Sequence, residues 1–174
     1  MLGGHVYRRY GLPYNSPTVG LYFFADDYIK LLSNLKKYLE SNLEIIPAEK
    51  SNHYQELKQK QQLNVPIGLL GEDVEVVFLH CLSSEEAIEK WNRRVKRVNY
   101  NNLIVKFSEM NGCSSEHLKA FHKMKFHKKI LFLAKPDPNV PEGIVIKKYT
   151  KNGCVVNDTT YYSRHLELTS FINK

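Results

Sequence analysis

Hydrogen-bonding side chains gather near the start of the chain, in the stretch HVYRRYGLPYNSP. Pro13 and Pro17 fix the backbone φ angle and keep the residues before them out of the helical region. A rigid, donor-rich loop of this kind suits ligand binding, although a structural linker would use the same prolines. The predicted substrate-binding residues of this loop are His5, Arg8, Arg9, Tyr14, Asn15 and Ser16.

His80 is the first catalytic candidate, because it stands at the end of the apolar run of residues 74–82. An imidazole titrates near neutral pH and can take a proton from a reacting hydroxyl. A core histidine bonded to a backbone carbonyl would show the same pattern. Asp26 and Asp27 follow another apolar run. Helix capping accounts for Asp26, so Asp27 is the second catalytic candidate.

A basic stripe follows His80 along the next predicted helix, where Lys90, Arg93, Arg94 and Arg97 share one side. Arginine grips phosphate with two parallel hydrogen bonds, so Arg93 is a candidate for a phosphorylated ligand. A solvated outer face, with arginine stems over apolar neighbours, is the alternative. Lys106 is a further substrate-binding candidate, at the carboxyl end of another predicted strand.

Composition and charge favour a globular protein with an anionic partner. The 174 residues are 43% hydrophobic and 25% charged, with a net charge of +7. We expect one domain over residues 1–174. No apolar run approaches the roughly 20 residues of a membrane helix, and no signal-peptide pattern opens the chain. The expected location is cytoplasmic, with peripheral membrane contact left open.

Strong catalytic and metal signatures are missing from the sequence. It has no Walker A motif, no Gly-x-Gly-x-x-Gly, no Gly-x-Ser-x-Gly and no His-Glu-x-x-His. The three cysteines, Cys81, Cys113 and Cys154, are widely spaced and match neither a zinc site nor a disulfide framework. We therefore expect no metal site and specify no cofactor.

Strand-like and helix-like segments alternate along the chain. Residues 74–82, 103–107 and 130–134 read as strands separated by single helices, which predicts a βαβαβ unit. The expected fold is α/β, a three-layer sandwich with a mostly parallel sheet flanked by helices. Ligands of such sheets bind outside the carboxyl ends of the strands, which is where His80 and Lys106 fall.

The remaining elements are predicted from periodicity and capping. Asp26 is expected to cap a helix that continues to Leu39, Ser83 to open a capping box with Glu86, and Ser114 or Ser115 to cap a helix ending near Met124. Residues 50–63 read as a loop or a loosely packed helix. Further strands are predicted at residues 19–24, 43–46, 144–149 and 154–156, and a closing helix at 166–172.

The order of sequence blocks resembles a bacterial family of domains of unknown function, the DUF1919 type. The blocks are GGHVYRRYGLPYNSPTVGLYF, DDYIKLLSNLKKYL, PIGLLGEDVEVVFLHCLSSEEAIEKWNRRVKRVNYNNLIVKF, FHKMKFHKKILFLAKP and HLELTSFINK. Members are commonly labelled exopolysaccharide or capsular polysaccharide biosynthesis proteins. In the family a strand precedes the glycine pair, whereas this chain begins at Met1 and Leu2. The resemblance therefore implies a domain that lacks an N-terminal strand.

Residues and resemblance together predict a transferase of bacterial exopolysaccharide or capsule biosynthesis. The donor carries phosphate, as a nucleotide-sugar or an acyl-coenzyme A, and the acceptor is a sugar. The alternative class is a non-catalytic binding protein for nucleic acid or another polyanion. Nucleic acid is the less favoured partner, because most aromatic residues lie in apolar stripes and no nucleic-acid motif is present.

Overall fold

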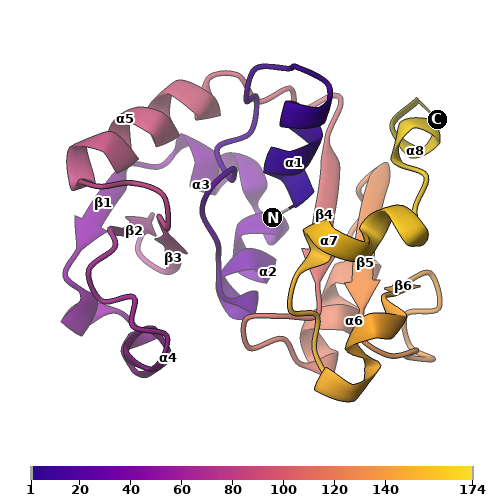
Figure 1. Cartoon of the computed structure of the whole chain (residues 1–174). Helices are drawn as coiled ribbons and strands as arrows, with labels where there is room; N and C mark the ends of the chain where they lie inside the picture. The colour runs from indigo at the N-terminus through magenta and orange to yellow at the C-terminus, as the bar shows by residue number, and fades with distance from the viewer. Residues whose placement is uncertain (1, 174) are drawn as a thin grey trace.

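A computed structural model describes residues 2–173, which form two halves built on separate three-stranded sheets (Figure 1). The first sheet is antiparallel, in the order β1 (Leu43–Ile46), β2 (Ile67–Leu70), β3 (Val74–Val77). A tight turn joins β2 to β3, and Gly71 takes a φ of +62° in it. Residues other than glycine rarely adopt such a φ, so Gly71 allows the hairpin.

The second sheet is parallel, in the order β4 (Ile104–Ser108), β5 (Lys128–Leu133), β6 (Ile144–Val145). Helix α6 (Ser115–Lys123) connects β4 to β5 as a crossover. Lys106 of β4 is paired with Ile130 of β5. β4 is an edge strand, because its other side has no partner strand within residues 2–173.

The other helices cover the faces of these two sheets. They are α1 (Leu2–Arg9), α2 (Ala25–Ser33), α3 (Leu35–Glu40), α4 (Tyr54–Gln59), α5 (Ser84–Val95), α7 (Asp158–Tyr161) and α8 (Leu168–Asn173). Short 3-10 helices lie at Ala48–Lys50, Lys147–Asn152 and Tyr162–Arg164. None of the helices within residues 2–173 is long and apolar enough to cross a membrane.

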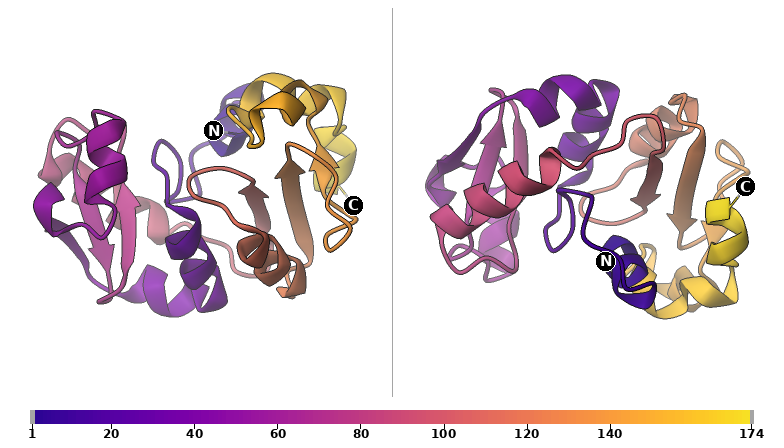
Figure 2. Two further views of the ribbon diagram at one scale, coloured as in Figure 1. Left: turned by 90° about the horizontal axis from the view of Figure 1, so that it is seen from below. Right: turned by 90° about the horizontal axis from the view of Figure 1, so that it is seen from above.

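Helix α2 lies between the two halves (Figure 2). Its Leu31 packs in the core of the antiparallel half, whereas its Ala25 and Leu32 pack against the parallel sheet and α6. The other face of the parallel sheet is covered by α1, α7 and α8. Each half therefore has its own sheet, and α2 supplies apolar side chains to both cores.

One of the expected strands is absent, and another is shorter than predicted. Residues 19–24 form no strand and make only one antiparallel bridge, between Tyr22 and Val77. The apolar run of residues 74–82 is a strand only to Val77, and its partner is the antiparallel β2. Both faces of β3 are nevertheless covered, since Val74 and Val76 belong to one core cluster and Val77 to another.

Two helix caps are as predicted and one is not. The Ser83 hydroxyl accepts the Glu86 N–H at 3.2 Å, and Ser114 caps α6 in a box with His117. Asp26 caps nothing: α2 begins at Ala25, and the Asp26 carboxylate instead lies 2.7 Å from a His117 ring nitrogen. The prediction of one helix to Leu39 was wrong as well, because the helix breaks between α2 and α3.

The predicted α/β class is confirmed, but the single three-layer sandwich with a mostly parallel sheet is not. The antiparallel sheet contains β3, so the expected βαβαβ unit is reduced to the βαβ unit of β4, α6 and β5. Residues 154–156 are not a strand, and β6 ends at Val145. Of the two alternatives for residues 50–63, the helix is present as α4.

Candidate functional site

A cavity of about 410 Å³ lies between α1, the segment that leads into α2, and β4. Its walls are mainly apolar, and its polar lining consists of Ser16, Thr18, Asn102, Lys106, Ser108 and Asn111, with the phenols of Tyr7, Tyr22 and Tyr28. Ligand sites commonly have this makeup, with a volume of roughly 300–1,000 Å³ and a few polar groups that fix orientation. We call this cavity the large cleft.

Alternation along β4 directs its polar residues into the large cleft. Side chains two residues apart point to the same face of a strand, so Ile104, Lys106 and Ser108 share the face that lines the cleft. Val105 and Phe107 pack on the opposite face, against α6, and Phe107 also contributes to the lining of the cleft. Ser108 is the last residue of β4, so the polar end of this face coincides with the carboxyl end of a parallel strand.

A turn after β4 joins the two halves beside the cleft. Asn111 adopts a left-handed φ of +53°, and its side-chain amide donates to the Phe23 carbonyl at 3.2 Å. Its own carbonyl accepts the Ala25 N–H at 2.9 Å. Asparagine tolerates this backbone conformation better than most residues. The turn therefore anchors the start of α2 to the parallel half.

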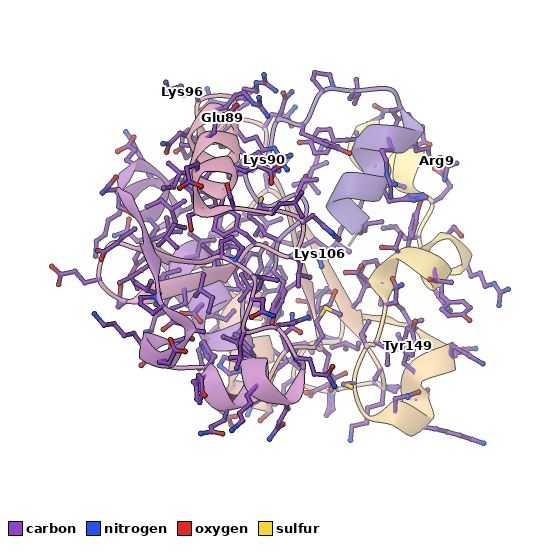
Figure 3. The ribbon with its side chains drawn as sticks, turned by 60° about the vertical axis from the view of Figure 1, so that its left-hand side comes forward. Arg9, Glu89, Lys90, Lys96, Lys106 and Tyr149 are labelled. Carbon is purple, nitrogen blue, oxygen red and sulfur yellow. The ribbon has the colours of Figure 1, made fainter. Side chains whose placement is uncertain are left out.

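A buried polar cluster forms the floor of the cleft, where Lys106, Ser108 and Asp158 meet (Figure 3 shows Lys106 near the centre of the molecule). Lys106 Nζ lies 2.5 Å from Asp158 Oδ2, and the Ser108 hydroxyl donates to the same oxygen at 2.9 Å. The other oxygen, Oδ1, accepts the Leu2 N–H at 3.1 Å. Asp158 is only 2% exposed, so its charge is balanced inside the protein.

The charge state of this cluster follows from its contacts. Burial alone would raise the pKa of Asp158, but the Lys106 ammonium and the Ser108 hydroxyl lower the pKa below its usual value. Asp158 is therefore an anion whose oxygens are already occupied, and it is not suited to accept a proton from a substrate. Lys106 also donates to Ser108 Oγ at 3.3 Å, which leaves one of its three N–H groups for a ligand.

Tyr28 adds a neutral hydroxyl to the same cleft. Burial and the Asp158 carboxylate both raise the pKa of Tyr28 above its usual value, so its phenol keeps its proton. No hydrogen bond to this hydroxyl is found among residues 2–173. Tyr28 lines the cleft, and it can donate a hydrogen bond to a bound ligand.

A smaller cavity of about 230 Å³ lies on the other side of residues 17–21. Ser16 and Thr18 line the large cleft, whereas Pro17 and Val19 line the smaller cavity, and Leu21 lines both. The polar lining of this second cavity consists of Tyr14, His80, Cys81, Lys90 and Arg94. We call it the basic cavity, because no acidic residue lines it.

The two predicted catalytic residues lie in different surroundings. His80 is exposed and lines the basic cavity. Asp27 lines neither cavity and is 4% exposed. Its carboxylate lies 2.6 Å from His53 Nε2 and accepts the Glu75 N–H at 2.9 Å. Asp27 thus ties α2 to β3, and its predicted catalytic role gains no support from its position.

The predicted binding loop is divided between several surroundings. Tyr14 lines the basic cavity and Ser16 the large cleft, while Asn15 and Arg8 are exposed. His5 and Arg9 both contact Tyr162: the His5 ring meets it edge to face at 5.6 Å, and Arg9 Nη1 donates to its hydroxyl at 3.3 Å. Two of these six residues therefore line a cavity.

The basic stripe of α5 is used largely within the protein. Arg94 donates to the Val19 carbonyl at 2.6 Å and Arg97 to the Tyr14 carbonyl at 3.3 Å. Lys90 pairs with Glu86 at 2.6 Å. Arg93 pairs with Glu89 at 3.0 Å and lines neither cavity. The hydrogen bonds of Arg94 and Arg97 hold residues 14–19 against α5. Arg94 lines a cavity, whereas Arg93 does not.

The sequence reasoning placed residues 106–109 among the functional candidates without singling out Ser108, and it missed Tyr28, which lines the large cleft, and Asp158, which binds Lys106. Ser108 follows Lys106 by two residues at the end of a strand, and this alternation was a usable signal. Asp158 and Tyr28 come from distant elements, and no local pattern marks them. Among residues 2–173, no three His, Cys, Asp or Glu side chains gather as a metal-binding group.

Comparison with known proteins gives a match over nearly the whole chain. The model of the family described as "Domain of unknown function (DUF1919)" matches residues 1–173. An uncharacterised protein of Haemophilus influenzae is 30% identical over 154 residues, which are 88% of this chain and 68% of that protein. Neither description names a reaction.

Proposed function

The chain belongs to the DUF1919 family, and from its geometry we propose that it is a transferase of bacterial exopolysaccharide or capsule biosynthesis. The proposed reaction moves a group from a phosphate-bearing donor, a nucleotide-sugar or an acyl-coenzyme A, to a sugar acceptor. The observation that carries the proposal is the large cleft with the Lys106 cluster at its floor. The link to polysaccharides comes from the sequence resemblance.

The lining of the large cleft suits a sugar. A sugar ring presents apolar C–H faces and polar hydroxyls, and the cleft offers aromatic and aliphatic walls with a few separated polar groups. Lys106 donates to a ligand oxygen, and the Tyr28 hydroxyl can act as a donor or an acceptor. We therefore assign the acceptor sugar to the large cleft.

Asp158 acts as a positioning residue in this scheme. Its Oδ2 lies 2.5 Å from Lys106 Nζ and 2.9 Å from the Ser108 hydroxyl, and these contacts hold both side chains in place. Because the Asp158 carboxylate is occupied, the proton of the attacking hydroxyl has to leave for another group. His80 is the candidate base, since its ring lines the basic cavity and Leu21 lines both cavities.

The proposal is tested by a transfer assay with matched lysine variants. Purified protein is incubated with nucleotide-sugars or acyl-coenzyme A and an oligosaccharide acceptor, and the products are identified by mass spectrometry. Lys106→Gln should lower kcat/KM by about tenfold or more, as expected for losing one charged hydrogen bond. Lys129→Gln is the control, because Lys129 lies on the opposite sheet face and donates to the carbonyls of Phe121 and His122.

Two results would count against the proposal. Equal turnover of the Lys106→Gln variant and the wild type would show that Lys106 has no role in the reaction. Tight binding of oligonucleotides that weakens linearly with the logarithm of salt concentration, without any transfer product, would favour the alternative class of polyanion-binding protein.

A further inference from the structure

We infer that the basic cavity is an anion site that holds the phosphate or diphosphate group of the donor. The inference rests on the proposed function for the identity of the donor. The binding of an anion can be measured without any transfer reaction.

Arg94 is the central observation, because it is a partly buried guanidinium without a carboxylate partner. No acidic side chain lies within ion-pair distance of Arg94 in the described part of the chain, whereas its neighbours Lys90 and Arg93 are both paired with glutamates. Buried charges in proteins are normally paired. A guanidinium left without an anion beside a cavity therefore indicates a ligand that brings one.

Arg94 is also held in a fixed orientation. Its Nη1 donates to the Val19 carbonyl at 2.6 Å, and its guanidinium lies 5.1 Å from the centre of the Tyr14 ring. These contacts fix one side of the planar group. The remaining N–H groups can then form the two parallel bonds that a phosphate accepts.

His80 lies at the same cavity with its ring unoccupied. Its backbone carbonyl accepts from Lys90 at 3.3 Å, but no hydrogen bond of its ring occurs within residues 2–173. Gly20, whose φ of +82° favours glycine, lies beside this ring. A neutral imidazole has one N–H group, which can donate to an anion, and a second ring nitrogen, which can accept a proton.

The size and charge of the basic cavity limit what it can hold. Its volume of about 230 Å³ is below the range of roughly 300–1,000 Å³ for complete small-molecule ligands. It has room for a phosphate or a diphosphate, and the rest of a donor would extend beyond it. The Lys90 charge is offset by Glu86, so Arg94 supplies the net positive charge.

The experiment compares two neighbouring arginines of α5. Binding of inorganic pyrophosphate and of uridine diphosphate to the intact chain is measured by calorimetry, for the wild type, Arg94→Gln and Arg93→Gln. Arg94→Gln should lower the affinity for both anions by about tenfold or more, since a charged hydrogen-bonding group is lost. Arg93→Gln removes the same charge one residue earlier and should bind within about twofold of the wild type.

A second measurement is needed because Arg94→Gln also removes the hydrogen bond to the Val19 carbonyl and could disturb that loop. In the wild type, pyrophosphate should shift the His80 ring signals in an NMR titration with the same dissociation constant as in calorimetry, and His80→Gln should weaken binding while leaving the fold intact. Unshifted His80 signals, or equal affinities of the Arg94→Gln and wild-type proteins, would overturn the inference. So would binding that depends on Lys106 instead. Anion binding without any transfer product would leave this site intact and refute only the proposed reaction.

Discussion

Replacing Lys106 by methionine should remove about 3 kcal/mol of stability at neutral pH. Methionine is similar in length and apolar, so the Asp158 carboxylate would stay buried without its ion pair. Breaking one partner of a buried pair costs about 3–5 kcal/mol, because the remaining charge is uncompensated. The Ser108 hydroxyl and the Leu2 N–H still donate to Asp158, so we expect the lower end of that range.

The same variant should invert the pH dependence of stability. In the wild type, burial opposes the Asp158 charge, but Lys106 and Ser108 lower the pKa of Asp158 overall. A carboxyl with a lowered folded pKa stabilises the protein above its unfolded pKa of about 3.9, and this stability is lost as the pH falls through the folded pKa. Without Lys106, burial dominates and raises the pKa of Asp158, so the variant should lose less stability at pH 5 than at pH 7.

Urea unfolding at pH 5 and pH 7 measures both effects. In thermal unfolding, a loss of about 3 kcal/mol should lower Tm by about 6–12 °C in a chain of this size. Asp158→Asn should cost less, because the Lys106 side chain is 24% exposed and can be hydrated. The double variant, Lys106→Met with Asp158→Asn, should recover most of the stability. A loss below about 1 kcal/mol, with the wild-type pH slope, would refute the reasoning.

Three further outcomes follow from other contacts. Burial disfavours the imidazolium of His53, but the Asp27 carboxylate outweighs this and raises its pKa; the resulting stability is lost as the pH rises through the folded pKa. His53→Gln should therefore cost about 1 kcal/mol at pH 6 and less at pH 9 in urea unfolding. Gly68→Ala should cost about 1–3 kcal/mol, since its Cβ would meet neighbouring side chains at 2.5 Å and 2.9 Å; an unchanged midpoint would contradict this. Burial raises the pKa of Cys113 to about 12, so iodoacetamide should modify the exposed Cys154 well before Cys113 at pH 7.5. Peptide mass spectrometry measures the order of modification, and modification of Cys113 first would contradict this prediction.

Local signals predicted much of the parallel half. Ser114 and the apolar positions behind it marked α6, and β4 and β5 fall within two residues of their predicted bounds. These elements depend on capping and periodicity, which are properties of neighbouring residues. The helix after Ser83 was predictable for the same reason.

The antiparallel half was mispredicted because the helix after Ser83 was interpreted as a crossover between two parallel strands. A strand covered on both faces is typical of parallel sheets, but α2, α3 and α5 cover one face of β3, and α4 and Tyr22 lie on the other side. The turn at Gly71, between two apolar runs, was a hairpin signal that would have indicated antiparallel pairing. Recognising it would have removed β3 from the parallel sheet.

The candidate site was only partly predictable. Lys106 and His80 were found because they end strand-like runs. The partner that fixes Lys106, Asp158, lies 52 residues away along the chain, and only the packing of α7 against β4 reveals it. The i,i+4 spacing of Glu89 and Arg93 was a usable signal that Arg93 is paired within α5, but no local pattern shows that Arg94 lines a cavity.

The position of α1 has a consequence for the order of folding during synthesis. α1 is the first of these helices to leave the ribosome, yet it docks in the parallel half, where the Leu2 N–H reaches Asp158 across 156 residues (Figure 1). Contacts of such high sequence separation form slowly, because the loop must close before they are made. The antiparallel half can complete its hairpins first, whereas the Lys106 cluster and the floor of the large cleft can form only after α7 has emerged. A nascent chain stopped before Asp158 would therefore carry the basic cavity but not the large cleft.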